Sequence, residues 1–293
     1  MRGPGGPAGL QNRFAALRKA VAVRFPRIPH FGGEGREMTD AAAALYNDLA
    51  DRYHLIFGDW DRALRWQGEV LERLIRAEMG PGPLSVLDCS AGIGTQSIGL
   101  ALRGYRVHAT DLSGKAIERA RREAARFGVS MTFGVADFRS LGEQVAGAFD
   151  VVISCDNALP HLRSDEDLLL AARNIRSKLR DEGLFLASIR DYDEVLRERP
   201  NATMPTVFDT PEGRRVYFQV WDWADDGRAY TVHLFLVDES GSAWETYHHE
   251  TRYRAVLREE LAEILRQAGL RDVAWQMPET SGYYQPVVKA RRG

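Results

Sequence analysis

Hydrophobic and polar residues follow two alternating periods over residues 84–190. Short apolar runs, each as long as a buried strand, are separated by stretches whose apolar residues recur at helical spacing. The expected strands are Ser85–Cys89, Arg106–Thr110, Met131–Val135, Asp150–Ser154 and Leu184–Ile189. The expected helices are Thr95–Arg103, Gly114–Phe127 and Asp165–Lys178, with Ser113 and Ser164 as caps of the last two. Such repeated crossover units predict an α/β fold with a mostly parallel sheet covered on both faces.

The pattern changes after Arg190. Long strands with alternating polarity are expected at Arg214–Trp223, Ala229–Asp238 and Ala243–Tyr253. Asp and Gly residues at 225–227 and 238–241 are typical of hairpin turns. This segment therefore predicts an antiparallel excursion inserted in the α/β domain. A helix at Arg258–Ala268 and strands at Val273–Met277 and Pro286–Ala290 then complete a seven-stranded, mostly parallel Rossmann-like sheet.

The N-terminal region differs from the rest of the chain. Residues 1–37 are rich in Gly and Pro and contain a basic stretch with apolar residues at helical spacing. One interpretation is a targeting or docking arm, because transit peptides are rich in Arg and poor in acids. The other is a flexible extension, or an upstream start before a natural Met38. We expect the flexible extension, since polar Gly/Pro-rich termini are usually disordered.

These patterns divide the chain into five segments. Helical spacing from about Ala41, through Leu45, Leu49 and Tyr53, and again over Asp61–Ala77 predicts a helical segment before the first strand. The expected segments are a flexible extension at 1–37, a helical lid at 38–83, a cofactor-binding core at 84–191, an antiparallel substrate cap at 192–256 and the last part of the core sheet at 257–293.

Composition narrows the classes of function. The chain has 293 residues and a net charge of −2, so it lacks the basic field typical of nucleic-acid binding. The two cysteines, Cys89 and Cys155, lie at apolar strand ends, which favours free thiols in a reducing, cytoplasmic compartment. No apolar run approaches about 20 residues. We therefore expect neither a nucleic-acid partner nor a membrane partner.

The stretch Ser85–Ser113 carries the strongest chemical signal. Asp88 ends the first strand, Gly92 and Gly94 form a turn before a helix, and Asp111 ends the second strand. Glycines let the backbone approach a ligand, and an acid at the second strand end accepts ribose hydroxyls. The unit predicts a site for an adenosine-containing cofactor. A packing turn that binds nothing is the alternative.

The details of the loop favour one class of cofactor over others. Position 97 is Ser rather than the third glycine of the dinucleotide motif G-x-G-x-x-G, which disfavours a nicotinamide cofactor. No G-x-x-x-x-G-K-[ST] motif occurs, so a nucleoside triphosphate site is unsupported.

Further motifs define a resemblance. The DxxxGxG loop, Asp111, the Ala136-Asp137-Phe138 turn and the polar end of the fourth strand at 155–162 together resemble class I S-adenosylmethionine-dependent methyltransferases. Within that superfamily the chain resembles glycine/sarcosine-type N-methyltransferases at three places. These are Ser90 in the glycine loop, the segment YHLIFGDWDRALRWQ, and the fifth strand end at 189–193. Asp191 departs from the asparagine of that family, and residues 1–37 have no counterpart in it.

The resemblance implies S-adenosylmethionine as the cofactor and a set of residues around it. The implied residues are Tyr53, Trp60, Asp88, Ser90, Gly92, Gly94, Thr95, Asp111, Leu112, Asp137, Phe138, Cys155 and Asp156. The glycine loop would line the methionine end, Asp111 would bind the ribose, and Asp137 with Phe138 would hold the adenine. Some of these residues have simpler alternatives: Asp88 as a helix cap, and Leu112, Tyr53 and Trp60 as core packing.

Arg190 is the most informative residue for the methyl acceptor. A guanidinium at the carboxyl end of a strand faces the ligand crevice of such a sheet and can bind a carboxylate in bidentate fashion. The alternative is a salt bridge to Asp191, Asp193 or Asp222. The expected catalytic residues are Asp156, His161 and Arg190, with a strand-end cap as the alternative for Asp156 and a structural role as the alternative for His161. The expected acceptor-binding residues are Asn157, Arg190, Tyr192, Trp221, Tyr247, Arg252 and Tyr283, with packing of the cap as the alternative for most of them.

The sequence thus predicts an enzyme. The reaction would transfer a methyl group, by in-line displacement, to a small-molecule acceptor that is an amine or an amino-acid nitrogen. O-methylation of a larger natural-product scaffold is the second reading, and a cofactor sensor without turnover is the third. No metal is expected, because His248-His249 has no companion at zinc-like spacing. The sequence leaves open whether the chain forms a homo-oligomer.

Overall fold

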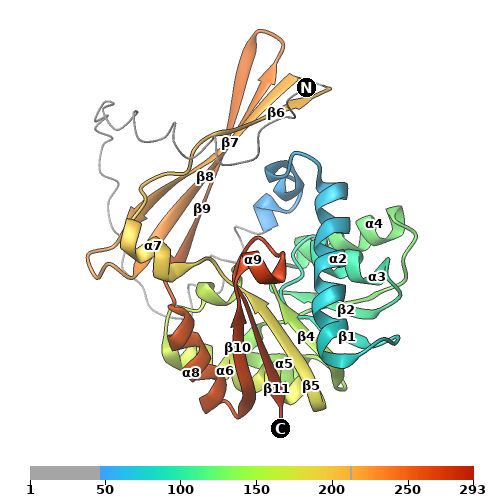
Figure 1. Cartoon of the computed structure of the whole chain (residues 1–293). Helices are drawn as coiled ribbons and strands as arrows, with labels where there is room; N and C mark the ends of the chain where they lie inside the picture. Colours follow the sequence, from blue (N-terminus) through green and yellow to red (C-terminus); the bar gives the residue numbers. More distant parts are fainter. Residues whose placement is uncertain (1–46, 212) are drawn as a thin grey trace, which may run out of the picture. The chain divides into compact units, whose positions relative to one another are not determined.

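The computed structural model describes residues 47–211 and 213–293, which form two β-sheets and the helices around them (Figure 1). The expected extension at 1–37 lies outside the described residues, and the five segment boundaries stay a prediction. Among the residues described, no helix is both long enough and apolar enough to cross a membrane.

The larger sheet has seven strands in the order β10-β11-β5-β4-β1-β2-β3. Its strands are β1 (Ser85–Asp88), β2 (Arg106–Asp111), β3 (Thr132–Val135), β4 (Phe149–Ser154), β5 (Leu179–Ser188), β10 (Leu270–Gln276) and β11 (Val287–Arg292). The pairs from β5 to β3 are parallel, and β11 runs antiparallel to both of its neighbours. The predicted seven-stranded, mostly parallel sheet is therefore confirmed.

Helices cover both faces of this sheet, as the alternating pattern predicts. One face carries α2 (Trp60–Met79), α3 (Thr95–Ala101) and α4 (Gly114–Arg126) (Figure 1). The other carries α5 (Leu141–Gln144), α6 (Asp165–Lys178) and α8 (Arg258–Gln267). Ser113 and Ser164 cap α4 and α6, because each hydroxyl accepts a hydrogen bond from a backbone N–H of the first turn, at 3.0 and 3.1 Å.

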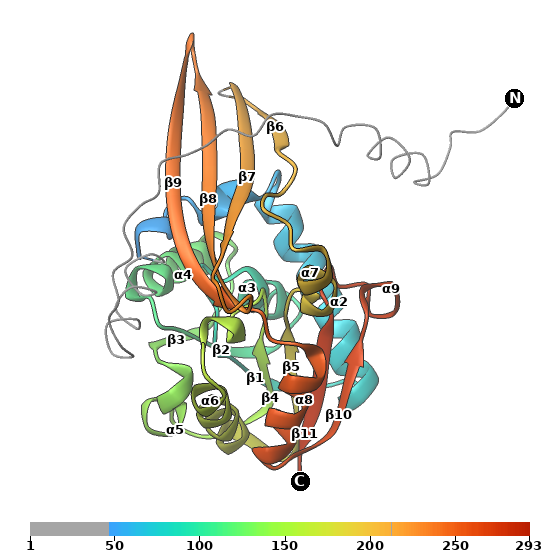
Figure 2. The same ribbon diagram turned by 90° about the vertical axis from the view of Figure 1, so that its left-hand side faces the viewer.

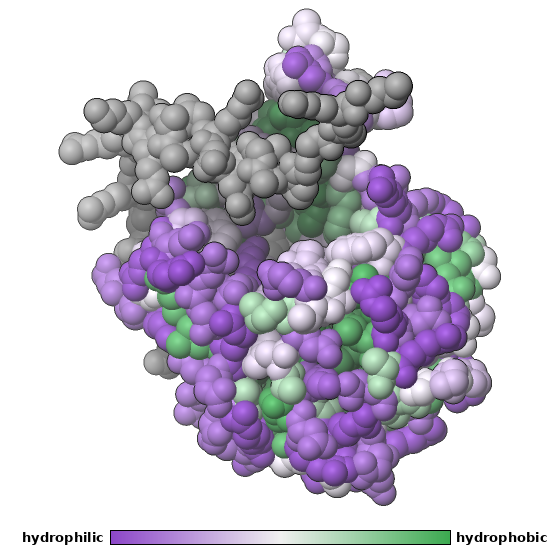
Figure 3. All heavy atoms as spheres, in the orientation of Figure 1, coloured by the Kyte–Doolittle hydropathy of each residue, from purple (hydrophilic) through white to green (hydrophobic). Residues whose placement is uncertain are grey.

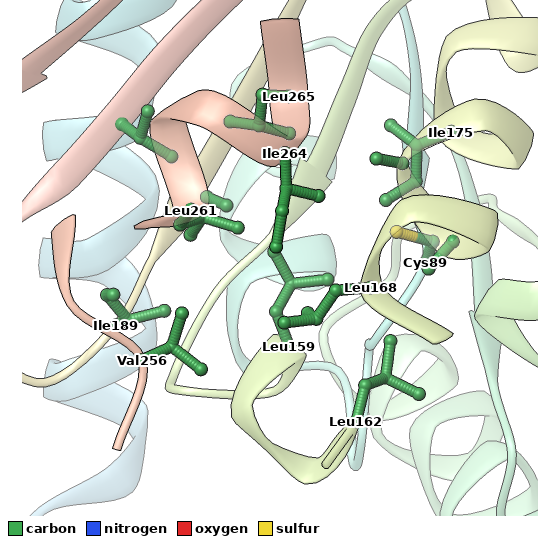
Figure 4. Close-up of a cluster of buried hydrophobic side chains, with 14 of the residues drawn as sticks. Cys89, Leu159, Leu162, Leu168, Ile175, Ile189, Val256, Leu261, Ile264 and Leu265 are labelled. Carbon is green, nitrogen blue, oxygen red and sulfur yellow. The ribbon is translucent and has the colours of Figure 1, made fainter. Parts of the chain in front are cut away.

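The main apolar core lies between the sheet and the helices α6 and α8. Figure 4 shows side chains of both helices, among them Leu168, Ile175 and Leu265, meeting those of the strand ends. The same buried cluster continues into Trp221, Tyr230, Val232 and Tyr253 of the second sheet. The two sheets therefore share one core.

The second sheet is antiparallel with the strand order β6-β7-β8-β9. Its strands are β6 (Thr206–Thr210), β7 (Gly213–Trp223), β8 (Ala229–Ser240) and β9 (Ala243–Arg254), and Figure 2 shows them rising from the parallel sheet. Three of these strands are predicted from the sequence. The edge strand β6 is not, because it is short and mostly exposed, so it lacks a clear alternation. Three short helices, α5, α7 (Tyr192–Glu198) and α9 (Pro278–Ser281), are also absent from the prediction.

Alternation along β7, β8 and β9 gives this sheet two faces with different side chains. The cross-strand pairs Trp221↔Val232 and Val232↔Thr251 lie on one face, which we call the inner face, since all three residues are at least partly buried and two line the cavity described below. The residues between them, Asp222 and His233 among them, lie on the opposite, outer face.

The helix α2 is fixed against α3 by two glycines. A Cβ placed on Gly68 would lie 2.5 Å from the backbone carbonyl of Gly99, closer than atoms approach in proteins. A short 3₁₀ helix, η3 (Tyr53–Ile56), precedes α2. Of the helical stretch expected from about Ala41, residues 41–46 fall outside the described residues; residues 47–49 are helical, and the stretch ends in η3.

Candidate active site

The glycine loop after β1 adopts a conformation that only small residues favour. Gly92 and Gly94 have φ values of 52° and 94°, in the left-handed region. A Cβ on Gly92 would meet no atom of the described residues within 4 Å, whereas one on Gly94 would lie 2.9 Å from the end of the Ile98 side chain. The backbone conformation thus favours glycine at both positions, and Gly92 has open space beside it within the described part of the chain. That space suits the close approach of a cofactor.

Asp111, at the end of β2, is joined to this loop. Its carboxylate accepts hydrogen bonds from the backbone N–H of Gly92 at 2.8 Å and of Ser113 at 2.9 Å. Burial raises the pKa of Asp111, although these N–H donors act in the opposite direction. The predicted ribose acid therefore lies directly beside the predicted methionine loop.

Asp88 is buried beneath the loop, with 1% of its surface exposed. Its carboxylate accepts hydrogen bonds from the Ser97 hydroxyl at 2.6 Å and the Ser90 N–H at 3.2 Å. Burial raises the pKa of Asp88 to about 7, against the effect of these two donors. Asp88 holds the loop to the start of α3, which is close to the capping alternative considered for it. At the same helix start, the Trp60 indole N–H donates to the Thr95 hydroxyl at 3.0 Å.

The residues predicted to hold the adenine already make contacts within the chain. The Asp137 carboxylate accepts hydrogen bonds from the Arg139 backbone N–H at 2.8 Å and from its guanidinium at 2.7 Å. Although burial acts to raise the pKa of Asp137, these Arg139 bonds hold it below its usual range. Phe138 packs against the main core cluster, and Cys155 is buried in the apolar cluster on the other face of the sheet. The Cys155 thiol is thus a packing group.

The end of β4 is a strained turn with a well-connected acid. Asp156 and Asn157 have φ values of 60° and 66°, which non-glycine residues rarely adopt. The Asp156 carboxylate accepts hydrogen bonds from the Gln96 amide at 2.7 Å, from the Tyr283 hydroxyl at 2.9 Å and from the Tyr284 hydroxyl. Burial raises the pKa of Asp156. The three hydrogen bonds hold this carboxylate at the carboxyl edge of the sheet.

A cavity of about 270 Å³ opens between this edge and the inner face of the antiparallel sheet. Its wall includes Tyr53, Asp156, Asn157, Arg190, His249 and Tyr253. Figure 3 shows hydrophobic surface between the antiparallel sheet and the parallel core, on a face that is otherwise mostly hydrophilic. Four of the predicted site residues, namely Tyr53, Asp156, Asn157 and Arg190, are thus brought together.

The positively charged guanidinium of Arg190 lies in this cavity among uncharged partners. Its guanidinium donates to the Tyr230 hydroxyl at 2.9 Å and to the Gln219 side-chain oxygen at 3.2 Å. It also lies 4.8 Å from the ring centroid of Trp221 and 5.0 Å from that of Tyr253. No carboxylate among the residues that the structure describes lies within ion-pair distance of it.

The salt-bridge alternative for Arg190 is therefore wrong. Asp191 and Asp193 both pair with Arg258, and Asp222 is hydrogen-bonded to His233 on the outer face.

Three predicted acceptor residues form a layer behind the cavity wall. The Tyr192 hydroxyl is hydrogen-bonded to that of Tyr230 at 2.8 Å, and the Trp221 indole N–H donates to Gln219 at 3.0 Å. The Tyr283 hydroxyl lies against Asp156. These residues support the groups that line the cavity without lining it themselves.

Two other predicted acceptor residues lie away from the cavity wall. Arg252 is exposed on the outer face, since it directly precedes the inward-facing Tyr253. Tyr247 is on the inner face but farther along β9, where its hydroxyl donates to Glu245 at 2.9 Å and its ring lies 4.1 Å from the Arg52 guanidinium. Neither residue lines the cavity.

His161 is placed differently from the prediction. Its ring stacks on Tyr253 with the centroids 4.3 Å apart, and its Nδ1 lies 3.5 Å from the Thr251 hydroxyl. Burial lowers the pKa of His161 to about 4. It is a neutral packing partner of a wall residue rather than part of the wall, so the prediction that it is catalytic is not supported by its position.

The cavity also contains residues that the sequence analysis does not select. Tyr217, Gln219 and His249 all lie on the inner face. The Nε2 atom of His249 is buried and has no hydrogen-bond partner among the described residues. Burial lowers the pKa of this imidazole, which favours its neutral form. The sequence signal that could identify His249 is the alternation along β9, which places residues 249, 251 and 253 on one face of the strand.

Comparison with known proteins agrees with this geometry. The profile of a methyltransferase domain family, described as "Methyltransferase domain", matches residues 86–183. The glycine/sarcosine N-methyltransferase of Parasynechococcus marenigrum (strain WH8102) is 31% identical over 55% of this chain and 56% of its own length. The chain thus spans about half the length of the curated relatives it matches.

Solved structures show the same fold over more of the chain. An S-adenosylmethionine-dependent methyltransferase from Clostridium acetobutylicum has a TM-score of 0.66 at 16% identity, covering 85% of this chain and 99% of its own. CalS10, an amino pentose methyltransferase from Micromonospora echinaspora, has a TM-score of 0.62 at 16% identity, covering 90% and 100%. Residues 86–183 therefore match a methyltransferase domain model, and the chain has the class I fold of these S-adenosylmethionine-dependent methyltransferases.

Proposed function

We propose that this protein is an enzyme that uses S-adenosylmethionine to methylate the amine nitrogen of a small acceptor that also carries a carboxylate. The family match, the open glycine loop and the joined Asp111 support the cofactor. The acceptor class rests on one observation, which is the partly buried Arg190 guanidinium without an acidic partner among the described residues.

The surroundings of Arg190 favour an anionic ligand. Burying a cation costs free energy unless an anion or several strong acceptors compensate it. Tyr230 and Gln219 supply only neutral oxygens, and Trp221 and Tyr253 supply aromatic faces. A substrate carboxylate would complete the site, because the planar guanidinium fork matches two carboxylate oxygens.

The remaining wall residues suit an amine. When bound, S-adenosylmethionine supplies a methyl group already activated by its sulfonium. The chain must then hold the nitrogen unprotonated and aligned, which can account for roughly 7–11 kcal/mol of a barrier. Desolvation in the cavity lowers the pKa of an ammonium group. His249 Nε2, neutral and without a partner among the described residues, is the candidate proton acceptor, and Asp156 is the candidate that orients the amine.

The size of the cavity supports one of the two enzyme hypotheses. Aromatic side chains in the wall, such as Tyr217 and Tyr253, would suit the flat scaffold of the O-methylation alternative. However, about 270 Å³ is below the roughly 300–1,000 Å³ typical of drug-sized ligands, which favours a small acceptor.

The test is a labelled-methyl assay with the full chain. Labelled S-adenosylmethionine is incubated with a panel of amino acids, the matched amines without a carboxylate, and aromatic hydroxyl acceptors. We expect label only in amines that carry a carboxylate. Label confined to aromatic hydroxyl products would overturn the acceptor class. Cofactor binding without any labelled product would favour the sensor hypothesis.

Substitution of Arg190 tests the carboxylate contact directly. Charge-assisted hydrogen bonds are worth about 1.5–3 kcal/mol, so Arg190→Lys should raise the acceptor KM roughly 10- to 100-fold. The cofactor Kd, measured by calorimetry, should change by less than about twofold. Arg197→Ala, on the exposed side of α7, is the matched control. An unchanged acceptor KM in Arg190→Lys and Arg190→Ala would rule out the assignment.

A further inference from the structure

We propose that the outer face of the antiparallel sheet binds a divalent transition-metal ion of the zinc class, through His233, His248 and Glu250. One nitrogen or oxygen atom from each of these residues can be chosen so that all three lie within 4.8 Å of one another. The site is separate from the cavity of the proposed methyl transfer. The chain spacing of the two histidines gives no hint of it, because β8 and β9 bring them together across the hairpin.

The distances suit a small tetrahedral ion. His233 Nδ1 lies 2.9 Å from His248 Nε2, and 3.7 Å from Glu250 Oε2. Zinc binds imidazole nitrogen and carboxylate oxygen at about 2.0–2.2 Å, so two ligand atoms of a tetrahedral site lie about 3.3 Å apart. These two separations bracket that value, and the third, between His248 and Glu250, is within 4.8 Å. Because the side chains of His248 and Glu250 are exposed, they can move to bring the three atoms around one ion.

A carboxylate behind His233 sets its tautomer. The Nε2 atom of His233 lies 3.1 Å from Asp222 Oδ2, so an Nε2–H donates to this acid. In the neutral ring that leaves Nδ1 unprotonated and directed at His248. Metal-binding histidines commonly have such a carboxylate on the other ring nitrogen, where it orients the ring and raises its basicity.

The three ligands are held by the sheet ladder. His233 is the direct cross-strand partner of Glu250, and His248 is the partner of Phe235, two residues along the same face. The His248 ring stacks on Phe235 with the centroids 4.9 Å apart. His233 is only 14% exposed, whereas the other two ligands are exposed, which leaves a fourth position for water.

The position implies a structural role. On β8 and β9 the neighbours of the ligands, Val232 and His249, point to the inner face and line the cavity. The ion would join β8 and β9 through its ligands, and β7 through the hydrogen bond between Asp222 and His233. It would therefore hold the three strands that form the cavity wall in register.

The test uses the full chain after removal of metal with a chelator. Titration with Zn²⁺ by calorimetry should give one site per chain, and Co²⁺ should give the visible absorption of a tetrahedral centre. His233→Asn and His248→Asn should each weaken Zn²⁺ binding at least tenfold. Asp222→Asn should weaken it roughly 10- to 100-fold. His249→Asn is the matched control for metal binding, because this histidine is adjacent to His248 but on the inner face.

A second measurement does not depend on any variant. X-ray absorption of the zinc-loaded chain should show two imidazole ligands and light oxygen or nitrogen atoms. Binding that is undetectable, or equally tight in the doubly substituted His233→Asn/His248→Asn chain, would overturn the proposal. Loss of methyl transfer alone would count against the proposed function and not against this site.

Discussion

At the scale of single residues, burial shifts the pKa values of the acids near the glycine loop. Asp88, Asp111 and Asp156 all have raised pKa values, and desolvation is the main cause in each case. These acids follow strands of a buried sheet, which is why the sequence identifies them. Their protonation depends on the surrounding donors, which only the folded structure brings together.

Asp88 gives a prediction on the pH dependence of stability. Its pKa is about 7 in the folded chain and near its usual 3.8 when unfolded. The folded state therefore binds more protons between these values, and the free energy of unfolding falls as pH rises through that window, by up to about 4 kcal/mol. Asp88→Asn removes this titration. Urea unfolding from pH 4 to 8 should show a flatter pH profile for this variant than for the wild-type chain.

A control keeps the Asp88 measurement specific. Asp209 is exposed on β6, so Asp209→Asn should leave the pH profile of the wild-type chain unchanged. Parallel profiles for Asp88→Asn and the wild-type chain would contradict the assignment.

At the scale of elements, most helices and strands are predictable and the direction of single side chains on long strands is not. The helix Asp165–Lys178 is predicted with its observed bounds, because its cap and its apolar spacing agree. Arg252 and Tyr247, both expected to bind the acceptor, lie on the outer face and on the inner face away from the cavity, respectively. A shift of one residue reverses every side chain of a strand, and the position along a hairpin depends on its pairing. The cavity is therefore the part of the site least visible in the sequence.

The contact between α2 and α3 gives a prediction at this scale. Gly68→Ala places a methyl group against the Gly99 backbone and must push α2 away from α3. Overpacking of this kind costs roughly 1–3 kcal/mol, or a fall in Tm of roughly 2–10 °C. Since α2 also carries Trp60 to Thr95, the cofactor Kd should rise as well.

Gly114→Ala is the matched control for Gly68→Ala. Among the residues that the structure describes, a Cβ there would meet only Val135, at an ordinary 3.9 Å. The Tm of both variants is measured by calorimetry. Equal Tm values would show that α2 can move away from α3 without a loss of stability.

At the scale of the whole molecule, the shared core makes the two sheets one folding unit. Trp221, Tyr230 and Tyr253 belong to the same buried cluster as the strands and helices of the parallel sheet. The sequence predicts an inserted cap, but it does not show that the base of this cap completes the core. That continuity depends on contacts between distant segments.

The shared core predicts cooperative unfolding of the region described. Thermal unfolding followed by tryptophan fluorescence, which reports on Trp221 and Trp223 among others, should coincide with the transition seen by far-UV circular dichroism. The calorimetric and van't Hoff enthalpies should then agree. A separate early transition of the fluorescence would mean that the antiparallel sheet melts on its own.

The two-faced sheet has a consequence for how this protein can diverge. Because β8 and β9 place cavity residues and outer-face residues at alternate positions, each face can be changed by substitution without altering the other. Insertion or deletion of a single residue is different. It would exchange the faces beyond that point and move His249 outward and His248 into the cavity. Relatives with hairpins of other lengths should therefore differ by changes at the Gly241 turn, or by pairs of residues.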